Sequence, residues 1–179
     1  MELKGSKTEA NLLKAFAGEA QARTKYDYYA SKAKKEGYEQ IAAIFSETAG
    51  NEKEHAKLWF KALHDNEVPD TITNLQDAAN GEKYEWSEMY KEFAEVAKEE
   101  GFEDIANLFA GAGAIEKHHE ERYLKLLANI NEGIVFKRGE EVVWICRNCG
   151  HIHIGKEAPL VCPVCSHPQS FQELRATNY

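Results

Sequence analysis

The sequence has no apolar run approaching the roughly 20 residues that a membrane-spanning helix needs. Its first residues, Met-Glu-Leu-Lys-Gly-Ser, lack the apolar core of a secretory signal peptide, which predicts a cytoplasmic protein. Basic residues are also in deficit, because 22 Lys and Arg stand against 30 Asp and Glu, for a net charge of −8. Nucleic-acid binders carry a basic face, so the sequence predicts neither a nucleic-acid nor a membrane partner.

Cysteine is scarce and confined to one region. The four cysteines form two Cys-x-x-Cys pairs, Cys146 with Cys149 and Cys162 with Cys165. In reducing cytosol this spacing favours a metal over disulfides. Four thiolates suit either zinc or a single iron ion. Zinc would be structural and iron would carry one electron, and the spacing does not choose between them.

The composition changes near residues 132–140. The chain before this point is rich in Ala, Glu, Lys and Leu with helical periodicity, whereas three of the four prolines lie beyond it. Short strands are expected at 134–136 and 142–145. The sequence therefore predicts a helical domain at 1–136 and a small four-cysteine domain at 137–179.

The helical part contains an internal repeat with an offset of 64 residues. Each half is expected to form two helices around a turn at Gly37 or Gly101. The predicted helices cover 8–35, 38–65, 82–99 and 102–131, with a polar crossover at 66–81. Two such hairpins predict a four-helix bundle with one longer connection. The repeated residues are Lys34, Glu36, Gly37, Glu39, Ile41, Ala42 and Phe45 with Lys98, Glu100, Gly101, Glu103, Ile105, Ala106 and Phe109; Tyr26 with Tyr90; and Glu52 and His55 with Glu116 and His119.

Carboxylates occur on the helix faces that should form the core. An ionised carboxylate costs several kcal/mol to bury unless a cation compensates it. Glu-x-x-His places both side chains on one helical face. Single Glu residues from two helices, with Glu-x-x-His from the other two, form the di-iron carboxylate sites of bundles. The sequence therefore predicts two metal ions held by Glu19, Glu52, His55, Glu82, Glu85, Glu116 and His119.

Several of these residues also have an ordinary structural explanation. Glu82 stands at a predicted helix start, where a carboxylate also favours the helix dipole. The glycines at 111 and 113 either leave room for a ligand or a close helix contact, or are tolerated weak points of a helix. His64 is expected to be a solvated helix-end residue. The histidines beside the cysteines, His151, His153 and His167, are expected at the surface or behind the thiolates.

With these residues together, the chain resembles the rubrerythrins over nearly its whole length. The resemblance rests on Phe16–Arg23, Asn51–His55, Gly81–Trp86 with Glu88–Tyr90, Glu116–His119 and both cysteine knuckles. It implies an all-α ferritin-like four-helix bundle followed by a small rubredoxin-like β/knuckle domain. In this family pattern Glu52 and Glu116 bridge two irons, Glu82 and His119 complete one, and Glu19 stays on the other, which exchanges His55 for Glu85. Tyr26 and Tyr90 match the family's tyrosines beside the ligands. Lys91 replaces the family's usual proline, for which we expect a local change of helix shape.

The resemblance further implies a hydrogen peroxide reductase active in oxidative-stress protection. Its cofactors would be a di-iron centre and one iron on four cysteines, with zinc as a possible substitute there. Electrons would come from rubredoxin or an NAD(P)H-dependent reductase, and the chain would form a homodimer or a higher homo-oligomer. Two alternatives remain, namely a ferroxidase or iron-storage protein on the same bundle and a non-enzymatic zinc-ribbon interaction protein. Loading of the carboxylate site with manganese or zinc is a further alternative.

Overall fold

The computed structural model describes residues 2–178, and the chain divides into two compact units, residues 1–70 and 71–179. The first unit is a helical hairpin. The second contains a further helical segment and a small β module. Among the described residues, no helix combines the length and the apolar character needed to cross a membrane.

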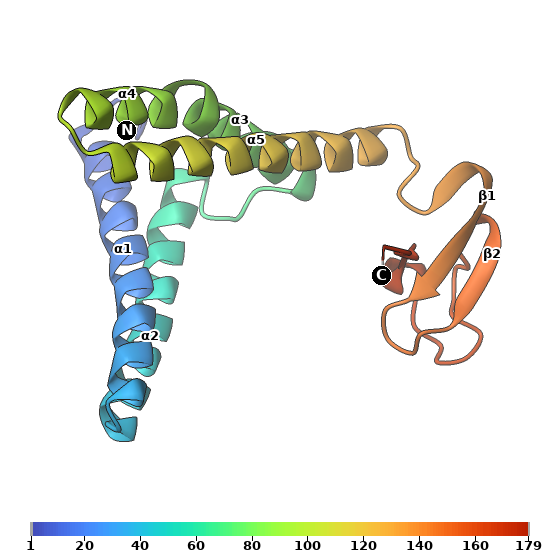
Figure 1. Ribbon diagram of the computed structural model, residues 1–179. Helices are drawn as coiled ribbons and strands as arrows, with labels where there is room; N and C mark the ends of the chain where they lie inside the picture. Colours follow the sequence, from blue (N-terminus) through green and yellow to red (C-terminus); the bar gives the residue numbers. More distant parts are fainter. Residues whose placement is uncertain (1, 179) are drawn as a thin grey trace. The chain divides into compact units, whose positions relative to one another are not determined.

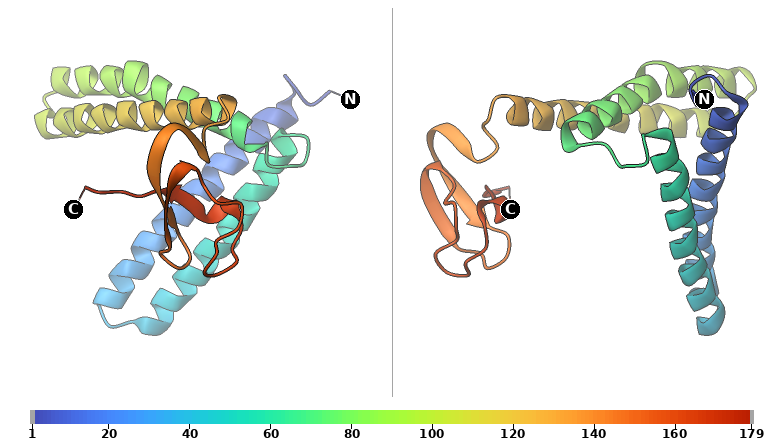
Figure 2. Two further views of the ribbon diagram at one scale, coloured as in Figure 1. Left: turned by 90° about the vertical axis from the view of Figure 1, so that its right-hand side faces the viewer. Right: turned by 180° about the vertical axis from the view of Figure 1, so that it is seen from behind.

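The first unit consists of α1 (Lys7–Lys35) and α2 (Glu39–Leu63), which lie side by side in every view (Figures 1 and 2). Ser6 caps α1 by accepting a hydrogen bond from the backbone N–H of Glu9 at 3.1 Å. Gly37 forms the turn at φ +86°, a conformation that favours glycine. The residues buried between the helices are all alanines, so the two backbones approach closely. They are Ala30, Ala33, Ala42, Ala49 and Ala56.

The helical part of the second unit repeats this design. Helix α3 (Thr71–Tyr84) passes through a π-helical turn, η1 (Glu85–Met89), into α4 (Tyr90–Glu99), and α5 (Glu103–Asn131) packs against all three (Figure 1). Gly101 forms the turn at φ +85°. The helices enclose Ala79, Ala97, Ala106 and Leu127.

Ring contacts confirm the internal repeat. Tyr26 and Phe45 lie 6.0 Å apart between ring centroids, and so do Tyr90 and Phe109. An edge-to-face ring completes each cluster at 5.5 Å, from Tyr29 in the first hairpin and from Phe93 in the second. The two hairpins therefore have matching aromatic clusters at matching positions.

Two secondary-structure predictions are wrong. The stretch 66–81 was predicted as a polar crossover, but α3 begins at Thr71, because Leu75 and Ala79 give it a face that packs on α5. No strand forms at 134–136. There Gly133 at φ +66° ends α5, and the N–H of Ile134 bonds to the carbonyl of Asn129 at 2.9 Å. The other helix ends agree with the prediction to within two residues.

The small module is a three-stranded antiparallel sheet in the order β2-β1-β3. Its strands are β1 (Lys137–Cys146), β2 (Ile152–Glu157) and β3 (Gln172–Leu174), and a short 3₁₀ turn (Gln169–Phe171) precedes β3. The fully buried Trp144 donates from its indole nitrogen to the carbonyl of Gly155 at 3.0 Å. The predicted fold class, a helical protein with a small C-terminal module, is confirmed, whereas the domain boundary at 136 stays a prediction.

Candidate metal centres

The first hairpin brings three of the predicted ligands together. Glu52 and His55 lie one turn apart on α2, and Nδ1 of His55 is 2.8 Å from Oε2 of Glu52. Glu19 faces them from α1, with 3.9 Å between its Oε1 and the same nitrogen. The Glu52 side chain is 17% exposed and that of His55 is 52% exposed. The set therefore has an enclosed carboxylate and a more open imidazole.

The second hairpin holds an equivalent set. Nδ1 of His119 is 2.6 Å from Oε2 of Glu116, its neighbour on α5. Glu82 on α3 lies 3.6 Å from that nitrogen, again at the longer distance. Burial, followed by the charge of Glu116, raises the pKa of the Glu82 carboxyl above its ordinary value. Each hairpin thus presents one Glu and one Glu-x-x-His pair in the same geometry.

Both sets fit a transition-metal ion. Their donor atoms lie within 4.8 Å of one another, as expected for ligands that each stand about 2.0–2.2 Å from a shared ion. Within each set, two carboxylates share the site with one imidazole. A bound cation would neutralise the carboxylates, which explains why three donors converge here. Carboxylate and imidazole together suit iron, manganese or zinc.

Glu85 belongs to neither set among the described residues. It is the first residue of the π-helical turn, three positions after Glu82, and its charge acts on both Glu82 and Tyr90. A π turn accommodates one extra residue within a helix and often marks a functional site. The second hairpin therefore has a third carboxylate, and so a fourth potential donor, close to its metal set.

The repeat itself contains a signal for this turn that the sequence analysis missed. Glu116 follows Glu52 by 64 residues and Tyr90 follows Tyr26 by 64, but Glu82 follows Glu19 by only 63. One residue has therefore been inserted between Glu82 and Tyr90. The π turn accommodates it.

Tyr90 lies next to the carboxylates of the second hairpin. Burial, and then the negative charges of Glu85, Glu116 and Glu82, raise the pKa of its hydroxyl above the ordinary value. Gly113 of α5 leaves room for its ring, because a Cβ there would stand 3.3 Å from Cβ of Tyr90. The close-contact interpretation of this glycine is thus supported, whereas Gly111 has open space around it.

Trp86, inside the π turn, makes a contact that the sequence did not suggest. Its indole N–H donates to Oε2 of Glu120 on α5 at 2.6 Å, and the ammonium group of Lys117 lies 5.5 Å from the indole ring centroid. This hydrogen bond ties the π turn, and with it Glu85, to the helix that carries Glu116 and His119.

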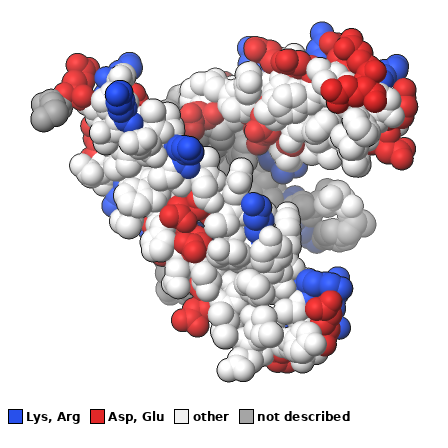
Figure 3. Space-filling model, turned by 90° about the vertical axis from the view of Figure 1, so that its left-hand side faces the viewer, with Lys and Arg blue, Asp and Glu red and all other residues white. Residues whose placement is uncertain are grey.

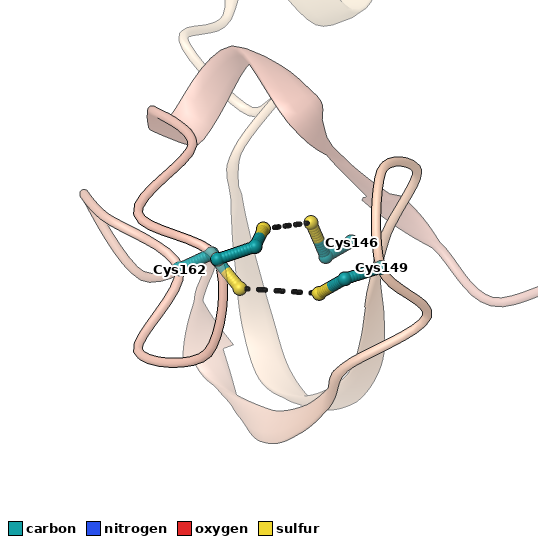
Figure 4. A group of neighbouring side chains, drawn as sticks. Cys146, Cys149 and Cys162 are labelled. Carbon is teal, nitrogen blue, oxygen red and sulfur yellow. Dashed lines mark hydrogen bonds between the residues drawn. The ribbon is translucent and has the colours of Figure 1, made fainter.

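The four cysteines converge from two loops of the small module (Figure 4). The sulfurs of Cys146 and Cys165 are 3.7 Å apart, and those of Cys149 and Cys162 are 3.6 Å apart. A tetrahedral ion with metal–sulfur bonds near 2.3 Å separates its ligands by about 3.8 Å. The spacing therefore fits a tetrahedral metal site, and no disulfide joins these free thiols.

The thiols differ in acidity. The backbone of His151 lowers the pKa of Cys149, but the thiol of Cys165 and burial outweigh it and raise that pKa to about 12. The backbone of His167 lowers the pKa of Cys165 to about 6, against the effect of burial. Four neighbouring thiols cannot all ionise without a cation, so metal binding must displace protons.

Among the described residues, the remaining histidines join none of the three metal sets. The carbonyls of His151 and His167 accept from the backbone N–H groups of Cys146 and Cys162, at 2.9 and 2.8 Å. The ring of His167 also packs on Phe171. His64 follows the last residue of α2, as predicted, but it is half-buried and stacks on Phe60 with 4.2 Å between centroids. The prediction of a solvated His64 is therefore wrong.

A repeated Glu and Glu-x-x-His set on two helical hairpins, followed by four converging thiols, defines a ferritin-like di-iron carboxylate protein with a four-cysteine metal module. Comparison with known proteins identifies the family. Residues 10–127 match the rubrerythrin family, and residues 144–172 match the rubrerythrin rubredoxin-like domain. The chain belongs to the rubrerythrin family.

Two individual rubrerythrins agree with this assignment. The chain is 51% identical to a rubrerythrin of Porphyromonas gingivalis over 99% of its own length and 94% of the relative's. It is also 51% identical to a rubrerythrin of Clostridium perfringens, over 99% and 98%. A solved structure of nigerythrin aligns with 97% of this chain and 91% of its own at 34% identity, with a TM-score of 0.36. The prediction of an iron-binding oxidoreductase is confirmed by family and donor sets together.

Proposed function

We propose that this chain is a non-haem di-iron peroxidase that reduces hydrogen peroxide to water and protects its host from oxidative stress. The observation that carries the proposal is the matched pair of carboxylate–histidine sets, one in each hairpin, in a chain that also holds four converging thiols. In this proposal Glu19, Glu52 and His55 bind one iron, and Glu82, Glu116 and His119 bind the other. Glu52 and Glu116 would each help to hold both ions.

When bound, the irons would supply the electrons for peroxide reduction, two from the ions held by the carboxylate sets and single electrons from the ion held by the four cysteines. Two protons are also needed to convert one peroxide into two waters. Tyr90 suits a role in holding a proton, because a tyrosine hydroxyl is protonated at neutral pH and the raised pKa of this one disfavours its ionisation further. Its phenol can then donate to the neighbouring carboxylates or to bound peroxide. Tyr26, with the same ring packing in the first hairpin, takes the equivalent position.

We further propose that His55 and Glu85 are alternative ligands of one iron, according to its oxidation state. His55 is the most exposed donor of the two sets, at 52%, so it can move at little packing cost. Glu85 lies outside both sets and has a negative charge to offer. Ferric iron prefers a hard anionic oxygen and ferrous iron accepts imidazole. Glu85 would therefore bind the ferric ion and His55 the ferrous ion.

The proposal extends to the protein's setting. The four-cysteine module receives electrons from a rubredoxin or an NAD(P)H-dependent reductase. The protein acts in the cytoplasm as a homodimer or a higher homo-oligomer, without membrane or nucleic-acid partners. The alternatives left open by the sequence, iron storage or a zinc-ribbon adaptor, predict different metals and different oligomers.

Metal analysis combined with turnover tests the proposal. Purified protein should contain iron at both kinds of site, be red when oxidised and bleach on reduction. It should consume hydrogen peroxide when a reductant and an electron carrier are supplied. Glu52→Ala should abolish turnover and leave the red colour, because the cysteine site is separate. A colourless protein with zinc on its thiols, or a cage-sized oligomer that oxidises ferrous iron without reducing peroxide, would contradict the assignment.

A further inference from the structure

A polar side chain of the small module is buried without a hydrogen bond. Figure 3 shows the usual situation on one face of the molecule, where acidic and basic side chains lie at the surface. Among residues 2–178, Gln172 is the only polar or charged residue that is buried, at 4% exposed. Neither Nε2 nor Oε1 of its carboxamide has a hydrogen-bond partner among the described residues. A buried amide group is destabilising unless it is hydrogen-bonded, so this side chain needs a partner close by.

The register of the sheet identifies the neighbour of Gln172. It is the first residue of β3 and pairs with Cys146, the last residue of β1. The backbone hydrogen bond belongs to the adjacent pair, in which the N–H of Arg147 donates to the carbonyl of Phe171 at 2.8 Å. Cys146 and Gln172 are therefore a non-hydrogen-bonded antiparallel pair. In such a pair both side chains stand on the same face, with about 4.5–5.5 Å between their Cβ atoms.

The carboxamide of Gln172 is long enough to reach the sulfur of Cys146. Cys146 is 1% exposed, and its sulfur points into the group of four thiols, 3.7 Å from that of Cys165 (Figure 4). The carboxamide nitrogen stands three bonds beyond Cβ, so rotation about the side-chain bonds of Gln172 can bring an N–H to that sulfur. Metal binding deprotonates the thiol. The resulting thiolate is a stronger acceptor, because hydrogen bonds to charged groups are the strong ones.

We propose that the carboxamide of Gln172 donates a hydrogen bond to the thiolate of Cys146 and thereby raises the reduction potential of the iron held by the four cysteines. The inference rests on the proposed electron-transfer role of that iron. When the external donor adds one electron, the site gains one negative charge, which the sulfurs share. A donor to sulfur therefore stabilises the ferrous state more than the ferric state. The module then accepts electrons from a weaker reductant.

Gln172 differs from the donors of two other thiols. Cys149 and Cys165 each accept from a backbone N–H, of His151 and His167. Those donors belong to the main chain of the knuckles, and a side-chain substitution does not remove them. Gln172 donates from its side chain, so its contribution to the reduction potential can be measured by mutation.

Gln172→Met tests the proposal in the full-length, iron-loaded protein, because methionine keeps the length of the side chain and lacks the N–H. An electrochemical titration, followed by visible absorption, measures the reduction potential of the four-cysteine iron. We expect the ferrous-to-ferric ratio at a fixed applied potential to fall about tenfold, which is a shift of about 59 mV to lower potential for one electron. Gln172→Asn, with a shorter carboxamide, should recover part of the shift. A change of less than about twofold in iron-replete Gln172→Met would overturn the proposal.

The matched control makes the same substitution at another glutamine of the module. The side-chain nitrogen of Gln169 donates to the carbonyl of Ala158 at 2.7 Å. Gln169→Met should therefore lower the melting temperature of the module and leave the reduction potential unchanged. An equal shift of potential in the two variants would show that any loosening of the module moves the potential, and it would overturn the proposed role of Gln172.

A second measurement needs neither a variant nor electron transfer. Wild-type protein is loaded with ¹¹³Cd on its four thiolates, and the carboxamide protons of Gln172 are observed by NMR. We expect a scalar coupling between ¹¹³Cd and one of these protons, transmitted through the hydrogen bond to sulfur. Its absence would overturn the proposal even if Gln172→Met fails to bind iron.

The two measurements separate failure of the inference from failure of the proposed function. Wild-type protein that holds zinc on its thiols and stays colourless would refute the electron-transfer role, although the coupling to ¹¹³Cd could still demonstrate the hydrogen bond. Red, iron-loaded protein without that coupling, and with the same potential in Gln172→Met, would refute the role of Gln172 alone.

Discussion

The hydrogen bond between Trp86 and Glu120 should stabilise the second hairpin measurably. It joins an indole N–H to a carboxylate at 2.6 Å and is partly buried. Hydrogen bonds to charged groups contribute about 1.5–3 kcal/mol, and partial exposure reduces this to about 1–2 kcal/mol. Trp86→Phe removes the donor and keeps most of the apolar ring. We expect that change to lower the free energy of unfolding by about this amount, with a small further loss from the contact with Lys117.

A double-mutant cycle isolates the interaction. Trp86→Phe, Glu120→Ala and the double variant are compared with wild type by urea unfolding of the metal-loaded protein, followed by far-ultraviolet circular dichroism. The cycle cancels the separate effects of ring size and helix propensity on the free energy of unfolding. It leaves a coupling free energy between Trp86 and Glu120, which we expect to be about 1 kcal/mol or more. A coupling below about 0.3 kcal/mol would refute the reasoning. The exposed pair His118 and Glu121 on the same helix, 3.5 Å apart with side chains 75% and 60% exposed, is the control and should show almost none.

The same variant should affect the metal site. Trp86 is inside the π turn that begins at Glu85, so losing its anchor should loosen the position of that carboxylate. We expect Trp86→Phe to change the visible spectrum of the carboxylate-bound iron and to lower kcat more than it raises KM. Trp86→Tyr, which restores a hydrogen-bond donor, should recover part of both. If the variant is less stable but its visible spectrum is unchanged, the contact between Trp86 and Glu120 has only a structural role.

Four further predictions concern single residues. Glu85→Ala should retain much of the iron and lose peroxidase turnover, measured by metal analysis and peroxide consumption; full activity would refute ligand exchange. Cys149→Ser should abolish the red colour and lower the melting temperature of the small module, whereas Asn148→Ser should do neither. Because the pKa of Cys149 is about 12, metal uptake by the module should release protons and strengthen as pH rises, which a chelator competition at several pH values would detect. The raised pKa of Glu82 means that the folded, metal-free protein loses stability as pH rises from the ordinary carboxyl pKa to the raised one. Glu82→Gln should therefore raise the melting temperature of metal-free protein at pH 7 and abolish iron binding at that hairpin.

The sequence identified the metal sets because their chemistry and spacing are local. Glu52 with His55 and Glu116 with His119 each span one helical turn, so their helices alone place them on a common face. Cys-x-x-Cys pairs act in the same way within a knuckle. The structure adds the partner across each hairpin, Glu19 or Glu82, at 3.9 and 3.6 Å. These contacts follow once the hairpin turns at Gly37 and Gly101 are known.

The missed features depend on tertiary packing. The stretch now known as α3 is polar, and only burial of residues such as Ala79 against α5 makes it helical. The sequence also did not predict that Ile41, Ile105 and Phe93 are exposed in this chain. Periodicity identifies an apolar face and does not say what covers it. The contact of Trp86 with Glu120 joins residues 34 positions apart and has no local signature.

The inserted residue explains how a repeated hairpin produces two unequal metal sites. Three residues after Glu19 stands Ala22, whereas three residues after Glu82 stands Glu85, at the start of the π turn. The first hairpin therefore offers three donors, and the second offers a fourth potential donor, the carboxylate of Glu85, nearby. Two identical hairpins would hold two equivalent ions, and neither ion would have a spare ligand. In the proposed ligand exchange, the extra residue makes Glu85 available as that spare ligand without displacing Tyr90 from its aromatic cluster, because the π turn confines the change to five residues.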